Sequence, residues 1–199
     1  MSDNAKRIRI IAAIGSVRPG NQTAKAVALV GDEMRHHDGV EVEVIDPAVL
    51  AMSLPGTAAD PALMQSLQAK VTAATGVILA TPEYHGSYSS VIKLFIEQLG
   101  YPPVLSGKPV ALLGVAAGAI GAIKSLEHLR SVCSHVGAIV LPGPASVPNV
   151  HKVFDEAGNC LDRGVERRIR RVGTSLIDYI HNRICPKIAL EQMVRGDDG

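Results

Sequence analysis

The segment 15–23 contains the residue types that bind a phosphate, directly after the apolar run 8–14. Gly15 and Gly20 let the backbone approach a ligand closely, and Arg18 can clamp a charged group. Four further side chains carry hydrogen-bond donors: Ser16, Asn21, Gln22 and Thr23. Backbone amides and the dipole at the start of a following helix favour an anion at the same place. The alternative is a capped strand-to-helix turn that binds nothing, which is a common arrangement.

A second polar segment, residues 81–87, directly follows the apolar run 76–80. Pro82 and Gly86 favour a turn, and Tyr84 offers a ring that can pack against a flat ligand. We interpret Glu83 as orienting the loop or facing a partner subunit, with proton donation as the alternative. We interpret His85 as part of the loop surface or pocket wall. Because histidine exchanges protons near neutral pH, a proton source for a quinone is the alternative.

Apolar runs and helical periodicities alternate along the chain, which predicts an α/β fold with a parallel sheet. The expected strands are residues 8–14, 40–45, 76–81, 110–115 and 138–141. The expected helices are residues 23–36, 60–73, 87–99, 119–136 and 162–181. Right-handed crossovers give a flavodoxin-like three-layer sandwich with a five-stranded parallel sheet in the order 2-1-3-4-5. Strands one and three are then neighbours, so both polar segments meet at the carboxyl edge of the sheet and suggest a flavin mononucleotide (FMN) site.

Three motifs resemble those of the NAD(P)H-dependent FMN reductase family of the flavodoxin-like superfamily. The first is Gly15-Ser16-Val17-Arg18, and the second is Pro82-Glu83-Tyr84-His85-Gly86-Ser87, followed by Ile92-Lys93 and Glu97. The third starts at Gly107-Lys108-Pro109-Val110 and continues through a glycine loop at 114–121 into residues 126–130. Two positions depart from the family pattern. Asn21 stands where many members have a phosphate-binding Ser, and the loop 115–121 lacks an Arg that would bear on NADPH preference.

The resemblance implies where the cofactor binds. The FMN phosphate is expected at Ser16, Arg18, Asn21, Gln22 and Thr23. The isoalloxazine ring is expected against Pro82, Glu83, Tyr84, His85 and Gly86, and against Ala116, Ala117 and Gly118 of the fourth-strand loop. Reduced flavin carries negative charge near N1 and C2=O, which amides of Gly118 and Ala119 at a helix start would stabilise. Hydride passes from NADPH or NADH to the flavin by the cofactor's own chemistry, so no catalytic side chain and no metal is expected.

The implied activity is NAD(P)H-dependent reduction of FMN, with onward transfer to quinones, azo compounds, chromate or a partner monooxygenase. A flavodoxin-type electron carrier and a flavin redox-sensing module are the alternatives. True flavodoxins usually have a Ser/Thr- and Gly-rich phosphate loop and an acidic, aromatic flavin surround. Residues 15–23 and a net charge of +1 do not provide that pattern. Direct oxidation of NAD(P)H by the purified protein would separate the enzyme from a sensor.

Composition limits the other classes of function. A chain of 199 residues with 47% apolar content fits one domain with a full core, expected over residues 1–185 with a C-terminal tail at 186–199. A net charge of +1 argues against a nucleic-acid surface. The apolar runs are too short to span a bilayer and the N-terminus lacks an apolar secretion segment, so a cytoplasmic protein is expected. The three cysteines show no metal-ligand or disulfide spacing.

The expected helix 87–99 carries an apolar stripe wider than contact with one sheet requires: Tyr88, Val91, Ile92, Phe95, Ile96 and Leu99. We interpret this stripe as the two-fold interface of a homodimer or homotetramer, because the resembling family is usually oligomeric. A deeply buried helix is the alternative. His128 and His135 lie two turns apart on one expected helix and are interpreted as packing residues, and the arginines of the helix 162–181 as a solvated face.

Overall fold

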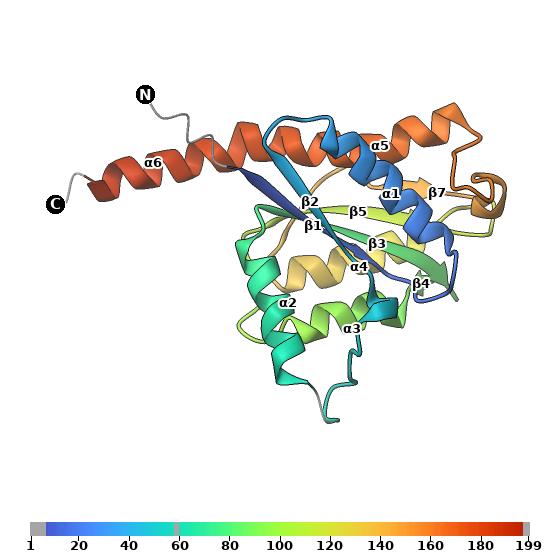
Figure 1. Cartoon of the computed structure of the whole chain (residues 1–199), viewed down its shortest axis with the longest axis horizontal. Helices are drawn as coiled ribbons and strands as arrows, with labels where there is room; N and C mark the ends of the chain where they lie inside the picture. The colour runs from blue at the N-terminus through green and yellow to red at the C-terminus, as the bar shows by residue number, and fades with distance from the viewer. Residues whose placement is uncertain (1–6, 58–59, 197–199) are drawn as a thin grey trace.

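The computed structural model describes residues 7–57 and 60–196 and shows a sheet between two layers of helices (Figure 1). The strands are β1 Ile8–Ile14, β2 Val40–Ile45, β3 Gly76–Tyr84, β4 Ser87–Tyr88, β5 Pro109–Val115, β6 Ile139–Val140 and β7 Ala145–Val147. Five of them pair in parallel in the order β2-β1-β3-β5-β6. This confirms the predicted α/β class and the predicted strand order 2-1-3-4-5.

The sheet has seven strands rather than the expected five. The expected fifth strand, residues 138–141, corresponds to β6, and β7 is an additional strand beyond it; the two pair with opposite ends of β5. The segment Pro142-Gly143-Pro144 lies between them, and proline cannot donate to a strand ladder. The other additional strand is β4, which pairs antiparallel with the end of β3.

Helices cover both faces of the sheet. They are α1 Gln22–Arg35, α2 Pro61–Ala73, α3 Ser90–Gln98, α4 Ile123–His135, α5 Arg163–Tyr179 and α6 Cys185–Gly196. A π-helical turn at Ile180–Ile184 joins α5 to α6, and short 3-10 turns lie at Pro47–Val49 and Val150–Lys152. α1 and α5 pack on one face, and α2, α3 and α4 pack on the other (Figure 1). Within the described ranges, no helix is long and apolar enough to cross a membrane.

The side chains of β1 contribute alternately to the two buried clusters, one on each face of the sheet. Ile10, Ala12 and Ile14 belong to the buried cluster with α1 and α5, and Ile11 and Ala13 to the cluster with α2, α3 and α4. Successive side chains of a strand point to opposite faces, and here both faces are covered. The almost continuous apolar sequence of β1 follows from this double burial.

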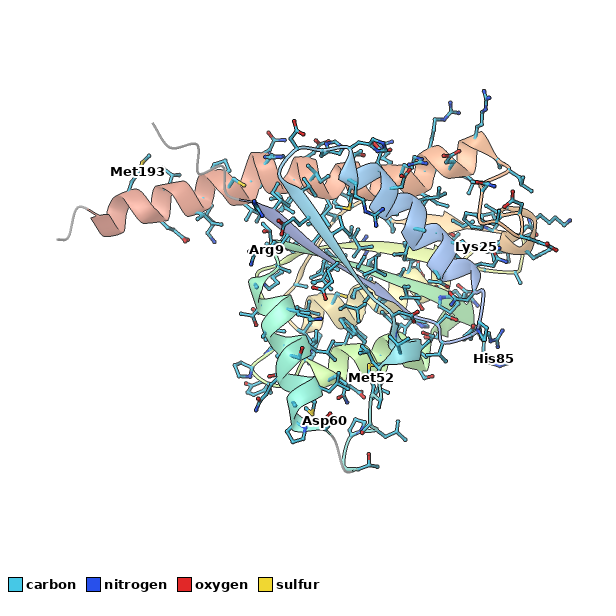
Figure 2. All side chains as sticks on the ribbon, viewed as in Figure 1. Arg9, Lys25, Met52, Asp60, His85 and Met193 are labelled. Carbon is cyan, nitrogen blue, oxygen red and sulfur yellow. The ribbon has the colours of Figure 1, made fainter. Side chains whose placement is uncertain are left out.

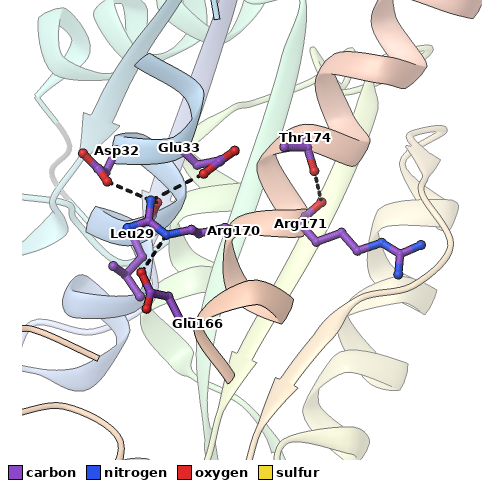
Figure 3. A network of polar contacts seen from close by, with 7 residues as sticks. All are labelled: Leu29, Asp32, Glu33, Glu166, Arg170, Arg171 and Thr174. Carbon is purple, nitrogen blue, oxygen red and sulfur yellow. Dashed lines mark hydrogen bonds and ion pairs between the residues drawn. The ribbon is translucent and has the colours of Figure 1, made fainter. Parts of the chain in front are cut away.

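Arg170 on α5 ties together the two helices of one layer (Figure 3). Its guanidinium donates to Asp32 Oδ2 at 2.7 Å and to Glu166 Oε1 at 2.8 Å. The hydrogen bond from Arg170 holds the pKa of Asp32 below its ordinary value. The two helices approach closely, since a Cβ on Gly173 would lie 2.7 Å from Met34 Cγ. This arginine is therefore a structural residue rather than part of a solvated face.

Two expected helix starts and the expected C-terminal tail differ from the structure. α3 begins at Ser90, because Ser87–Tyr88 forms β4 and Ser89 Oγ accepts from the Ile92 amide as the helix cap. α4 begins at Ile123, because the positive φ of Gly121, +81°, lies outside the helical region. The expected tail continues as helix α6, which projects away from the sheet (Figure 1). Residues 197–199 of the expected tail lie outside the described residues.

The apolar stripe on α3 is buried within the chain itself. Ile92 and Phe95 have no exposed surface, and Ile96 and Leu99 are almost as well covered. All four belong to the core cluster on the α2, α3 and α4 face of the sheet. The interpretation as a two-fold interface is therefore wrong for these four side chains, which follow the alternative of a deeply buried helix. Tyr88 and Val91, the other two members of the stripe, are half-buried.

Candidate functional site

The two polar segments meet at the carboxyl edge of the sheet, where β1 and β3 are paired neighbours. The Gly15 amide donates to Ala80 O at 2.7 Å, and Ser89 Oγ donates to Gly15 O at 2.6 Å. A Cβ on Gly15 would lie 2.5 Å from Ala80 O, so only glycine fits there without displacing backbone. Ser89 also caps α3, and the start of that helix therefore fixes the position of the first segment.

Asn21 orders the first segment from within. Its Oδ1 accepts from the Ala24 amide at 2.8 Å as the cap of α1, and its Nδ2 donates to Arg18 O at 2.8 Å. The side chain expected as a phosphate donor thus has both polar atoms engaged inside the loop. The amides of Gln22 and Thr23 start α1 and have no acceptor within the described part of the chain. These two backbone donors and the helix dipole are available to bind an anion.

The buried Oε1 atom of Gln22 also lies at the start of α1. Among the described residues it is the one buried side-chain oxygen or nitrogen without a hydrogen-bond partner. Leaving such a group unpaired costs about 1–3 kcal/mol. A hydroxyl-bearing ligand beside the start of α1 would supply the missing donor. Ser16 and Thr23 are also buried, whereas residues 17–20 between them are exposed, so the segment has buried polar ends and an open middle.

The second segment is a tight β-hairpin. Tyr84 at the end of β3 pairs with Ser87 of β4, and only His85 and Gly86 connect them. Both connecting residues have positive φ, 50° and 75°, which is the two-residue turn that matches the twist of a hairpin. Figure 2 shows His85 at the end of the molecule where the sheet ends. A Cβ on Gly86 would meet only Lys124 Cδ, at 3.5 Å, so the backbone conformation rather than crowding requires glycine.

A cation–π contact joins the two segments. The Arg18 Cζ atom lies 4.8 Å from the centroid of the Tyr84 ring. Arg18 is exposed and forms no ion pair with any described residue, so its charge remains available to a ligand. The structure thus brings the expected phosphate clamp and the expected ring platform into direct contact.

Two further contacts fasten the hairpin to α4. Glu83 Oε2 accepts from the Ser125 amide at 3.1 Å, and Ser87 Oγ lies 3.1 Å from His128 Nδ1. Glu83 therefore orients the loop, as one of its two interpretations predicts. His128, interpreted as a packing residue from its spacing alone, is exposed and bonded beside the candidate site. Its partner Ser87 lies 41 residues away in sequence, so no local signal identified the pair.

The loop after β5, residues 116–122, is the third segment at the carboxyl edge of the sheet and corresponds to the expected fourth-strand loop. Gly118 O accepts from the amides of Gly121 and Asn149, and the Ala122 amide donates to Ser146 Oγ at 2.9 Å. The amides from Ala117 to Ile120 have no acceptor within the described ranges. Because α4 starts at Ile123, the expectation that Gly118 and Ala119 sit at the helix start is wrong. They offer free amides from a loop without the helix dipole.

A profile of the NADPH-dependent FMN reductase family matches residues 8–152, which include all three loops of this edge. The chain belongs to this family. It is a flavin oxidoreductase with FMN as cofactor and NAD(P)H as electron donor. The predicted class of enzyme and its predicted cofactors are confirmed.

Relatives of known activity agree with this assignment to the FMN reductase family. The chain is 30% identical over 171 residues to an NAD(P)H-dependent FMN reductase of Pseudomonas aeruginosa, covering 81% of this chain and 88% of that protein. It is 26% identical over 178 residues to an FMN-dependent NADPH-azoreductase of Staphylococcus aureus, covering 85% and 93%. The solved structure of FerB, a flavoenzyme NAD(P)H:acceptor oxidoreductase from Paracoccus denitrificans, has the same fold, with 22% identity, 88% and 98% coverage, and a TM-score of 0.74.

Three further observations concern residues outside the candidate site: a surface hollow, a buried thiol and the search for metal ligands. A hollow of about 700 Å³ is lined by Leu141, Pro142, Gly143, Arg171, Ser175, Asp178, Tyr179, Asn182 and Arg183, none of which was predicted to bind the cofactor. Burial raises the pKa of the Cys133 thiol to about 12, so this cysteine stays protonated. Within residues 7–57 and 60–196, no cluster of three or more His, Cys, Asp or Glu side chains could hold a metal ion.

Proposed function

We propose that this chain binds FMN across the carboxyl edge of its sheet and reduces it with NADPH or NADH. The observation that carries the proposal is the Arg18–Tyr84 contact, at 4.8 Å, next to the free amides of Gln22 and Thr23. It brings an anion clamp and an aromatic platform together at the edge where open α/β sheets bind nucleotides. Ser16 and Thr23 complete the phosphate cradle in this proposal.

The chain's own residues would bind and orient rather than exchange protons. Bound FMN would supply the redox chemistry by accepting hydride from the nicotinamide. The Gln22 oxygen would accept from a ribityl hydroxyl, because it is buried without a donor in the protein. The free amides from Ala117 to Ile120 would donate to polar atoms of the ring edge. The Pro82–Gly86 turn, held by its left-handed His85 and Gly86, would define one wall of the ring pocket.

Flat electron acceptors are the substrate class that the proposed site fits. Val17 of the first loop and Ile120 of the fourth-strand loop are exposed apolar side chains, 48% and 82% exposed. An exposed apolar rim around a cofactor favours quinones and azo compounds over a small hydrophilic ion. The S. aureus relative is named an azoreductase, which supports the azo class for this chain.

The test is anaerobic reduction of the FMN-loaded protein. We expect NADPH or NADH to bleach the oxidised flavin absorbance, and a naphthoquinone or azo dye to restore it. An electron carrier or a flavin sensor makes the opposite prediction, since it binds FMN without accepting hydride from a nicotinamide. Bound FMN that neither dinucleotide reduces would therefore contradict the proposed function.

A further inference from the structure

The first turn of α4 has no cap of its own. The residue before the helix is Ala122, whose side chain cannot accept a hydrogen bond, and the first turn contains no acidic residue. The carboxylate that caps the first turn of α4 comes from strand β3. Glu83 Oε2 of β3 accepts from the amide of Ser125, the third residue of α4, at 3.1 Å. This is the amide that a capping side chain normally satisfies.

The strand that carries Glu83 is held firmly. Glu83 pairs with Tyr88 across the β3–β4 hairpin, and Ser87 on the same hairpin lies 3.1 Å from His128 Nδ1 one turn further along α4. Two separate contacts therefore join the hairpin to one helix. The positions of the hairpin and of the fourth-strand loop that precedes α4 are coupled through Glu83.

The charge of Glu83 matters as well as its hydrogen bond. A helix N-terminus carries the equivalent of roughly half a positive charge, which stabilises nearby anions. FMN gains negative charge on its pyrimidine ring when it is reduced, and the proposed ring site lies between the hairpin and the loop before α4. A carboxylate on the first turn of α4 neutralises the positive pole there. It also adds a full negative charge beside the ring.

We infer that Glu83 is a positioning residue that caps α4 from β3 and keeps bound FMN a strong reductant by opposing negative charge on the reduced ring. This inference rests on the proposed function, because it requires FMN at this edge. It assigns to Glu83 neither proton transfer nor contact with the FMN phosphate.

Two substitutions separate the hydrogen bond from the charge. Glu83→Gln keeps an oxygen that can accept from Ser125 and removes the charge, whereas Glu83→Ala removes both. Asp60→Asn is the matched control, because Asp60 Oδ1 caps α2 through the Ala62 amide at 2.9 Å in the same way. Figure 2 shows Asp60 well separated from His85 and hence from the hairpin tip.

The first measurement is the midpoint potential of bound FMN, from dye-equilibrated titrations of the wild type, Glu83→Gln and Asp60→Asn. For Glu83→Gln we expect reduced FMN to gain at least tenfold in affinity relative to oxidised FMN. That ratio corresponds to a rise of about 30 mV for a two-electron couple. Asp60→Asn should leave the potential unchanged. An unchanged or lower potential in Glu83→Gln, or an equal rise in Asp60→Asn, would overturn the inference, as would complete loss of FMN binding by Glu83→Gln.

The second measurement is hydrogen exchange of the Ser125 amide without FMN. We expect protection in the wild type and in Glu83→Gln, and faster exchange in Glu83→Ala. Equal protection in all three proteins would show that Glu83 is not the cap. Because this experiment needs no cofactor, it tests the contact even if the wild type binds no FMN, a result that would count against the proposed function.

Discussion

The guanidinium of Arg18 lies over the ring of Tyr84, with Cζ 4.8 Å from the ring centroid, although Arg18 follows β1 and Tyr84 is the last residue of β3. The contact lies beyond Ile14 and Ala80, the last paired residues of β1 and β3, where β3 continues to Tyr84. It leaves the charge of Arg18 exposed and free of ion pairs with described residues. In the proposed function, the phosphate and the ring of FMN would therefore bind at adjacent parts of one surface.

Arg18→Ala should weaken FMN binding by about 1.5–3 kcal/mol, the range for a hydrogen bond to a charged group. Riboflavin lacks the phosphate and should lose much less affinity. Titration of both flavins by fluorescence quenching measures the difference, with Arg167→Ala on the exposed face of α5 as the control. Equal losses for FMN and riboflavin would show that Arg18 does not recognise the phosphate.

Gly15→Ala should both destabilise the protein and weaken FMN binding. The added Cβ would lie 2.5 Å from Ala80 O, so the first loop must move. Overpacking of this kind costs about 1–3 kcal/mol. Gly31→Ala on α1 is the matched control, because its Cβ would meet nothing closer than 3.6 Å and alanine favours a helix. Urea unfolding measures the stability of both variants, and FMN titration measures their affinity for the cofactor. A Gly15→Ala protein with wild-type stability and wild-type FMN affinity would contradict the prediction.

Phe95→Glu should unfold the protein rather than dissociate an oligomer. Phe95 is fully buried in the chain's own core, and an unpaired carboxylate there costs several kcal/mol. Circular dichroism and light scattering distinguish the two outcomes. Glu97→Lys, on the exposed side of the same helix, should remain folded. A folded Phe95→Glu protein of smaller size would restore the interface that the structure argues against.

The Asp32–Arg170 pair should contribute stability that disappears in acid. The folded-state pKa of Asp32 is lower than its ordinary value of 3.8, so the folded state binds the proton less readily than the unfolded state. The contribution is therefore present above pH 3.8 and is lost as the pH falls through the lower folded-state value. Asp32→Asn should cost about 0.2–1 kcal/mol near neutral pH, because the pair is partly exposed. Urea unfolding across pH measures this, and a difference that grows in acid would be the contrary result.

His85→Ala should retain FMN and most of its reduction by NAD(P)H. The residue occupies one of two turn positions with positive φ, and hydride transfer to a flavin needs no side-chain acid. Stopped-flow reduction of bound flavin is the appropriate measurement. A loss of about 100-fold or more, the size of general acid–base catalysis, would make His85 chemically essential.

The sequence predicted the features that depend on local patterns. The doubly buried strands, the strand order and the two polar loops follow from apolar runs and from the glycines and prolines that end them. The Asp60 cap of α2 was also visible, since Asp-Pro is a typical helix start. These signals lie within a few residues of one another.

What the sequence missed depends on contacts between distant segments. The apolar stripe of α3 looked like an interface because nothing local shows that the chain's own core covers Ile92, Phe95 and Ile96. Asn21 was expected only as a phosphate donor, and its contacts with Arg18 O and the Ala24 amide inside the loop were not foreseen. Glu83 meets Ser125 across 42 residues, and only the fold brings them together.

The most direct test of the account is a crystal structure of the protein with FMN bound. We predict the phosphate at the amides of Gln22 and Thr23 beside Arg18, and the ring against the Tyr84–Gly86 turn and the loop 116–122. Electron density for FMN elsewhere, such as in the hollow beside Arg171 and Arg183, would contradict the central claim that the carboxyl edge of β1 and β3 holds the cofactor.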